Sequence, residues 1–131
     1  TYLAMQHKED VLFVGRLLPN ELSRVMGSSL ALVYASLFEG FGIPILEAFN
    51  SETAVITSNL TSMPEVAGDA ALLVNPYSVD QIATAMYQIK SDSQFRKSLI
   101  QKGKIQRRKF TWDQTASQLW ASIEKVLANL P

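Results

Sequence analysis

Short apolar runs alternate with amphipathic stretches along most of this chain. Three uninterrupted runs, Leu30–Tyr34, Ala54–Thr57 and Ala71–Val74, have the length and composition of strands that are buried on both faces of a sheet. A fourth run of the same kind, Val11–Val14, ends at Gly15. The pattern therefore predicts about four strands.

Helical patterns occupy the intervals between these runs. Asn20 is expected to cap a helix that stops near Gly27. Two capping boxes follow, the first at Ser62 and Glu65 and the second at Ser78 and Gln81. Strands that alternate with helices imply parallel strands and right-handed crossovers. We expect an α/β fold, a Rossmann-like parallel sheet of about four strands with helices on both faces.

The last two helices are predicted on the carboxyl-terminal side of Ser91. One should start at about Gln94 and run into a basic segment, and the other should be capped by Thr111. The final helix places its apolar residues on one side, namely Trp112, Ala116, Leu119, Trp120, Ile123, Val126, Leu127 and Leu130. These aromatic residues are interpreted as packing residues rather than as a binding platform.

The most informative stretch of the chain is Glu39–Glu47, which reads as a loop that opens into a helix. Gly40 and Gly42 allow a ligand to approach the main chain closely. Pro44 suits the first turn of a helix, so the helix should begin near Gly42 or Ile43. The free N–H groups and positive dipole end of such a helix are well suited to phosphate.

Two carboxylates flank this stretch. Glu39 lies in the loop, and Glu47 lies about one turn inside the helix and points back towards the loop. Each also has an ordinary interpretation, Glu39 as an exposed loop acid and Glu47 as a solvated helix residue. Under that interpretation, however, the glycines and the proline between them would be coincidental.

At these residues the sequence resembles the family 4 glycosyltransferases, retaining enzymes of the two-domain GT-B architecture. Their nucleotide-sugar domain carries the signature E-G-F-G-x-P-x-x-E, and every fixed position is present from Glu39 to Glu47. The resemblance implies that Glu39 acts in catalysis by orienting the donor sugar and favouring its developing positive charge. It implies that Glu47 accepts hydrogen bonds from the ribose. It assigns donor binding to the backbone at Gly40, Phe41, Gly42 and Ile43.

The resemblance also assigns a role to the loop after the first predicted strand. Gly15 and Arg16 would lie near the nucleotide base and contact it largely through main chain. A solvated loop cation is the alternative for Arg16.

The resemblance runs from about Val11 to the C-terminus and covers only the later part of the family's C-terminal domain. We therefore expect residues 1–131 to be a single, truncated donor-binding domain of a hexosyltransferase-type enzyme. The acceptor domain would be absent, as would the strand and helix that supply an Arg and a Lys to the donor diphosphate. Such a parent enzyme would transfer a sugar from a nucleoside diphosphate sugar with retention, in glycan or polysaccharide synthesis. This piece alone is expected to be inactive.

The composition bears on three further features, namely nucleic-acid binding, disulfide bonds and metal sites. The 131 residues carry twelve basic and twelve acidic side chains, so net charge does not point to nucleic acid. The absence of cysteine excludes a disulfide scaffold and fits a reducing compartment such as the cytoplasm. We expect no cofactor and no metal, because there is no Asp-x-Asp element and His7 is the only histidine.

Seven of the twelve basic residues fall between positions 96 and 109 with no acid among them. This basic segment could contact an anionic membrane surface, since many relatives use lipid-linked acceptors, or it could be a solvated helix face. Nucleic acid is disfavoured because aromatic residues are not interleaved with the cations.

Two other functions compete with sugar transfer. A truncated sheet would expose an edge, and the last helix would expose its apolar stripe. Both features would favour a non-catalytic module that self-associates or docks on a partner, and the missing N-terminal domain is one such partner. A GT-B epimerase fits less well, because the nine-residue signature belongs to the transferases.

Overall fold

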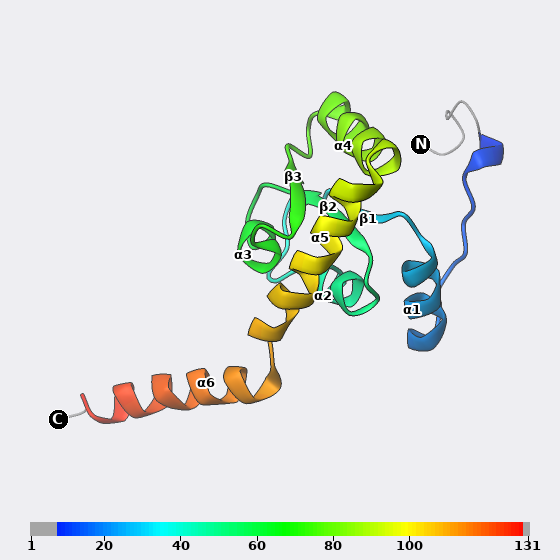
Figure 1. Cartoon of the computed structure of the whole chain (residues 1–131). Helices are drawn as coiled ribbons and strands as arrows, with labels where there is room; N and C mark the ends of the chain where they lie inside the picture. The colour runs from blue at the N-terminus through cyan, green and yellow to red at the C-terminus, as the bar shows by residue number, and fades with distance from the viewer. Residues whose placement is uncertain (1–7, 130–131) are drawn as a thin grey trace.

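The computed structural model describes residues 8–129 of the chain (Figure 1). The elements, in order, are η2 (Lys8–Asp10), α1 (Pro19–Ser28), β1 (Ala31–Tyr34), α2 (Ile43–Asn50), β2 (Ala54–Ser58), α3 (Met63–Ala67), β3 (Ala71–Val74), α4 (Val79–Ser91), α5 (Ser93–Gln106), η3 (Arg107–Lys109) and α6 (Trp112–Leu127).

Three parallel strands form the sheet in the order β1-β2-β3. Leu32 lies beside Val55 in one ladder, and Val55 lies beside Ala71 in the other. All five residues of β2 are buried, as its apolar run predicts for a central strand. The predicted α/β fold with a parallel sheet is confirmed, and the described sheet has three strands rather than four.

The missing strand is Val11–Val14, and this prediction is wrong. These residues precede α1 as irregular chain, and Leu12 and Phe13 are 85% and 70% exposed. A strand needs a neighbour for its N–H and C=O groups, and this segment pairs with none of the described strands. An open apolar groove of about 520 Å³ lies between β1 and α4. Local β-propensity alone does not place a segment in a sheet.

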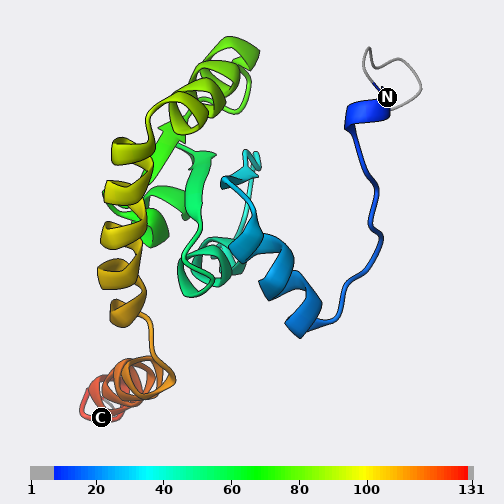
Figure 2. The ribbon, with the colours of Figure 1, turned by 45° about the vertical axis from the view of Figure 1, so that its right-hand side comes forward.

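Helices cover both faces of the sheet, as predicted (Figure 2). Successive residues of β2 point to opposite sides, so Val55 joins one apolar cluster and Ile56 the other. The first cluster is completed by α1, α2 and α3, with Phe49 as its largest member. The second is completed by α4 and α5 through residues such as Ile89 and Leu99.

Two of the four predicted helix caps, Ser78 and Thr111, are confirmed. The hydroxyl of Ser78 accepts the N–H of Gln81 at 3.3 Å, and that of Thr111 accepts the N–H of Gln114 at 3.2 Å. The start of α1 differs, because the helix begins at Pro19 and Asn20 already lies in its first turn. Proline is pre-organised for the first helical position and takes precedence over the asparagine there.

Helix α5 packs closely on α2 and α3. A Cβ atom on Gly103 would lie 2.6 Å from the Phe49 ring, so the absence of a side chain lets the two helices approach. Three residues later, the buried side-chain amide of Gln106 donates to the carbonyl of Val66 at 3.1 Å. These contacts hold α5 against both α2 and α3.

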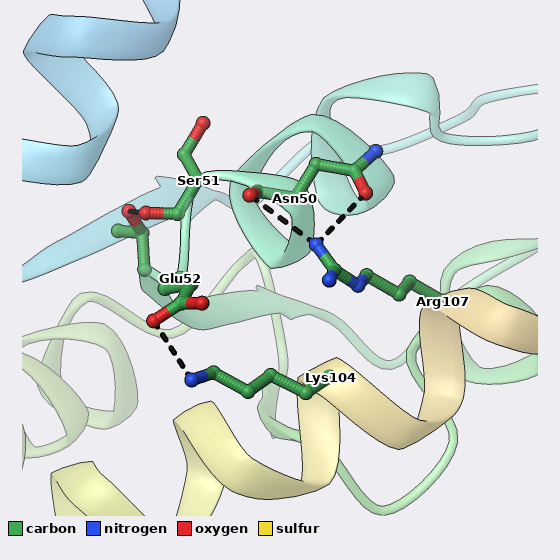
Figure 3. A network of polar contacts seen from close by, with 6 residues as sticks. Asn50, Ser51, Glu52, Lys104 and Arg107 are labelled. Carbon is green, nitrogen blue, oxygen red and sulfur yellow. Dashed lines mark hydrogen bonds and ion pairs between the residues drawn. The ribbon is translucent and has the colours of Figure 1, made fainter.

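Several cations of the basic segment are engaged within the domain. The ammonium of Lys104 lies 2.8 Å from the Glu52 carboxylate, and Arg107 donates to the carbonyl and side-chain oxygens of Asn50 (Figure 3). Lys102 pairs with Asp69 at 3.1 Å and holds the pKa of that carboxyl below its usual range. The membrane contact predicted for this segment stays a prediction.

The last helix, α6, leaves the rest of the molecule after Phe110 and projects away from it (Figures 1 and 2). None of its sixteen residues is buried. Within residues 8–129, neither α6 nor any other helix has the length and apolar character needed to cross a membrane.

We expect Gly103→Ala to destabilise the fold although it adds a better helix former. The helix propensity gain is about 1 kcal/mol, whereas forcing a methyl group against a buried ring costs roughly 1–3 kcal/mol. Denaturant unfolding should show a net loss of about 1 kcal/mol, and at most about 2 kcal/mol, in the free energy of unfolding. In a Phe49→Leu background the same substitution should cost much less. An equal loss in both backgrounds would show that the ring contact is not the cause.

Candidate functional site

The β1–α2 loop, residues 35–42, follows the carboxyl end of β1 and carries the first half of the signature. It ends at Gly42, which caps α2 with a φ of 104° and a ψ of 45°. This left-handed conformation favours glycine, and a Cβ there would also come within 3.2 Å of the Ile45 side chain. Pro44 lies in the first turn of α2, as predicted. The helix thus begins directly beneath the loop.

The loop and the helix start present a row of unused donors. Within the described chain, the main-chain N–H groups of Gly40, Phe41, Gly42 and Ile43 donate to no protein acceptor. The positive end of the α2 dipole lies at the same place. Gly40, Phe41 and Ile43 are exposed and Gly42 is buried, so an anionic ligand can approach this row from the three exposed residues.

Glu39 is held at the side of this row by hydroxyl groups. Ser36 Oγ donates to Glu39 Oε1 at 2.9 Å, and the Tyr34 hydroxyl also hydrogen-bonds the carboxylate. Hydrogen bonds from Tyr34 and Ser36 hold the pKa of Glu39 below its usual value. Burial, and then the Glu39 carboxylate, raise the pKa of Tyr34 to about 12. Glu39 is thus an ionised carboxylate in a defined position at neutral pH.

A second set of contacts comes from the loop after β2. Ser62 Oγ donates to the Glu39 carbonyl at 3.0 Å, and the Glu39 N–H donates to Thr61 Oγ1 at 3.4 Å. Thr61 adopts a φ of 51°, a conformation that few residues other than glycine take. The loops that follow β1 and β2 are therefore joined through the backbone of Glu39.

These contacts overturn the capping box predicted at Ser62 and Glu65. The Ser62 side chain makes no capping hydrogen bond, because its backbone is already in the helical region and its hydroxyl reaches across to Glu39. A serine three residues before a glutamate fits either role in sequence. Only the pairing of β1 with β2, which brings the two loops together, distinguishes them.

Glu47 lies one turn inside α2 with a half-buried side chain. Within residues 8–129 it makes no hydrogen bond or ion pair through its side chain, so its carboxylate is free to accept. The rings of Phe41 and Phe110 pack edge to face at a centroid distance of 5.8 Å, and Phe41 stays 43% exposed. The structure therefore brings the predicted residues from Glu39 to Glu47 onto one short loop–helix unit.

Gly15 and Arg16 lie apart from this unit. Both are exposed, and Arg16 has no hydrogen bond or ion pair with any residue that the structure describes. The segment that precedes α1 runs outside that helix and away from α3 in both views (Figures 1 and 2). Because the strand predicted before Gly15 is not formed, nothing places these two residues at the carboxyl edge of the sheet. Their contact with a nucleotide base stays a prediction.

Several curated proteins that are similar to this chain are named as mannosyltransferases. O-antigen chain mannosyltransferase B of Escherichia coli is 36% identical over 106 residues, which cover 81% of this chain and 28% of that protein. The MMP alpha-(1->4)-mannosyltransferase of Mycolicibacterium hassiacum is 30% identical over 114 residues, which cover 84% of this chain and 28% of that protein.

Among solved structures, the chain is similar to sucrose-phosphate synthase from Thermosynechococcus elongatus, with a TM-score of 0.80 at 25% identity. The match covers 93% of this chain and 31% of that one. It confirms the predicted GT-B type of α/β fold. The chain spans less than a third of the length of each of these three proteins.

The model of the family described as glycosyl transferases group 1 matches residues 2–106, which include the whole signature and all three strands. This chain therefore belongs to the glycosyl transferases group 1.

Proposed function

We propose that the chain is the donor-binding part of a retaining glycosyltransferase. The whole enzyme would transfer a hexose from a nucleoside diphosphate sugar to an acceptor in glycan or polysaccharide synthesis. Mannose is the first candidate for the sugar, because several of the similar proteins are named as mannosyltransferases. The observation that carries the proposal is the row of unused N–H groups from Gly40 to Ile43 beside the ionised Glu39.

The donor diphosphate is the part of the ligand that this row fits. Phosphate oxygens accept hydrogen bonds from main-chain N–H groups and are stabilised by the positive end of α2. The exposed Gly40 lets the ligand approach the main chain. We propose that no metal ion is needed, since the amides and the helix dipole meet part of the diphosphate charge.

Glu39 is proposed to act on the sugar. Breaking the bond between the anomeric carbon and the phosphate builds positive charge on the sugar and negative charge on the departing diphosphate. A carboxylate that is held ionised by Tyr34 and Ser36 favours the positive charge and orients the ring through its hydroxyls. In this role Glu39 does not attack the sugar.

Glu47 is proposed to accept hydrogen bonds from the ribose hydroxyls of the nucleotide. It lies one turn below Gly42, so a ligand whose diphosphate sits at the helix start would place its ribose within reach. Its carboxylate is half buried and unused by described residues, so it could pair with hydroxyl groups without breaking a contact in the fold.

Residues 1–131 alone are proposed to bind donor without transferring sugar. Stabilising the departing diphosphate requires cations as well as backbone dipoles in metal-independent chemistry of this kind. Among the described residues, no lysine or arginine contacts the β1–α2 loop by a hydrogen bond or ion pair. The acceptor site would lie in the remaining two thirds of an enzyme the size of the relatives.

Calorimetric titration with UDP, GDP and ADP tests donor binding. We expect one nucleotide to bind selectively, and Glu47→Ala to weaken it by roughly tenfold or more, because a charge-assisted hydrogen bond contributes about 1.5–3 kcal/mol. A chelator should leave the affinity unchanged.

Glu65→Ala is the matched control, since Glu65 is an exposed glutamate on the neighbouring helix α3. Equal losses in the two variants would argue against a ribose contact at Glu47. Robust turnover of a nucleotide sugar by these 131 residues would contradict the proposal that they are inactive alone.

The role of Glu39 is tested by Glu39→Gln in a full-length enzyme that contains this chain. The substitution removes the negative charge but keeps the shape of the side chain. We expect kcat to fall by a hundredfold or more, on the order of 3 kcal/mol, with little change in donor affinity. If kcat is kept and only donor affinity is lost, Glu39 is a ground-state binding residue.

A further inference from the structure

The main-chain carbonyl of Glu39 is bound by a side chain from a neighbouring loop. Ser62 Oγ donates to this oxygen at 3.0 Å, across a separation of 23 positions in the sequence. The residues on either side of Glu39, Phe38 and Gly40, are exposed, so water could satisfy the same carbonyl. The contact with Ser62 is therefore not needed merely to pair a buried acceptor, and its effect on the rest of the peptide has to be considered.

The carbonyl of Glu39 and the N–H of Gly40 belong to one planar peptide unit. In a trans peptide these two groups point in opposite directions. Because the carbonyl is bound by Ser62, the N–H of Gly40 points away from the β2–α3 loop, and it donates to no protein acceptor in the described chain. This N–H is the first donor in the row from Gly40 to Ile43. Its direction is thus set by the bond to the carbonyl on the other side of the same peptide.

Gly40 leaves this peptide otherwise free to rotate. Glycine adopts positive and negative φ about equally, so a peptide that precedes a glycine can turn over while its flanking residues stay in place, as between turns of type I and type II. A Cβ at Gly40 would meet no atom within 4 Å, so no packing contact restrains the residue. A peptide that has turned over would present the carbonyl oxygen of Glu39 where the N–H now lies. That oxygen would repel a phosphate.

Ser62 is itself held in a fixed position. Its carbonyl accepts the N–H of Val66 at 3.1 Å, and the next residue, Met63, is fully buried. The Ser62 hydroxyl also lies 3.8 Å from Met63 Sδ, but it has one proton and the carbonyl at 3.0 Å is the stronger acceptor. The preceding residue, Thr61, keeps a φ of 51°, which a residue other than glycine retains only where its surroundings determine it. The hydroxyl is therefore presented to the peptide from a rigid loop.

We propose that Ser62 is a positioning residue that holds the Glu39–Gly40 peptide with the N–H of Gly40 directed at the donor diphosphate. In this role Ser62 touches no atom of the donor and acts only through the peptide. The inference rests on the proposed function, because the diphosphate is the anion that the row of donors would bind. Without the hydroxyl, part of the molecules would have the peptide turned over. The apparent affinity for the anion then falls in proportion to the fraction that stays competent.

Calorimetric titration of the chain with UDP, GDP and ADP measures this loss in Ser62→Ala. We expect the affinity for the nucleotide that binds to fall roughly threefold to tenfold, because one hydrogen bond shifts a balance between two backbone conformers by about that factor. Ser62→Thr keeps a hydroxyl at the same position and should keep the affinity. Ser98→Ala is the matched control, since it removes a hydroxyl-to-carbonyl bond of 2.7 Å on α5, and it should leave the affinity unchanged.

The outcomes of this titration separate the role of Ser62 from the proposed function. If the unsubstituted chain binds a nucleotide and Ser62→Ala binds it equally well, the positioning role is overturned while donor binding stands. An equal loss in Ser62→Thr and Ser62→Ala would also overturn it, because the hydroxyl would not be the cause. If the unsubstituted chain binds none of the three nucleotides, donor binding is overturned, and this inference with it.

Backbone NMR of the ligand-free chain separates positioning from a general loss of stability. In Ser62→Ala we expect the resonances of the Glu39 carbonyl carbon and the Gly40 amide to shift. The Gly40 amide should also broaden, because the two orientations of the peptide exchange on the microsecond to millisecond timescale. Ser62→Thr and Ser98→Ala should leave the Gly40 amide sharp. A sharp, unshifted Gly40 amide in Ser62→Ala would overturn the proposal even if the nucleotide affinity fell.

Discussion

The packing of α2 between the sheet and α5 is the constraint on which both the fold and the proposed site depend. Ile45 and Phe49 are almost fully buried, and each contributes roughly 1.5–3 kcal/mol by leaving water. Gly103 lets α5 approach the Phe49 ring, while Lys104 and Arg107 hold the residues at the end of α2. The carboxyl-terminal half of α2 is thereby fixed, and this fixes the direction in which its amino terminus points.

The site uses that fixed helix together with the loops at the carboxyl edge of the sheet. Gly42 turns the chain so that its N–H and those of its neighbours stay unpaired, and Ser62 holds the Glu39 backbone from the next strand. Tyr34, at the end of β1, reaches the Glu39 carboxylate. A parallel sheet brings these groups together because its carboxyl ends lie side by side, which is where ligands bind in open α/β folds.

Local signals in the sequence were sufficient for much of this arrangement. The three apolar runs became β1, β2 and β3, and Ser78 and Thr111 cap their helices as such residues do in isolation. Glycines and a proline within nine residues placed the start of α2 correctly. In each case the interactions that determine the element join residues that are only a few positions apart in the sequence.

The remaining features depend on contacts between distant segments. Val11–Val14 has the composition of a strand but joins none of the described strands, and Ser62 has the pattern of a cap but binds a residue 23 positions earlier. Neither feature can be predicted from a few neighbouring residues, because each depends on which strands lie side by side in the sheet. The link between Phe41 and Phe110, which joins the β1–α2 loop to the start of α6, is of the same kind.

The central claim is that the start of α2 and the loop above it receive the donor diphosphate. Backbone amide NMR of the 131-residue chain, titrated with a nucleoside diphosphate, tests it most directly because each amide reports separately. The account predicts the largest shifts at Gly40, Phe41, Gly42 and Ile43, with little change along the basic segment. Shifts concentrated at residues 96–109, with the loop amides unmoved, would contradict it.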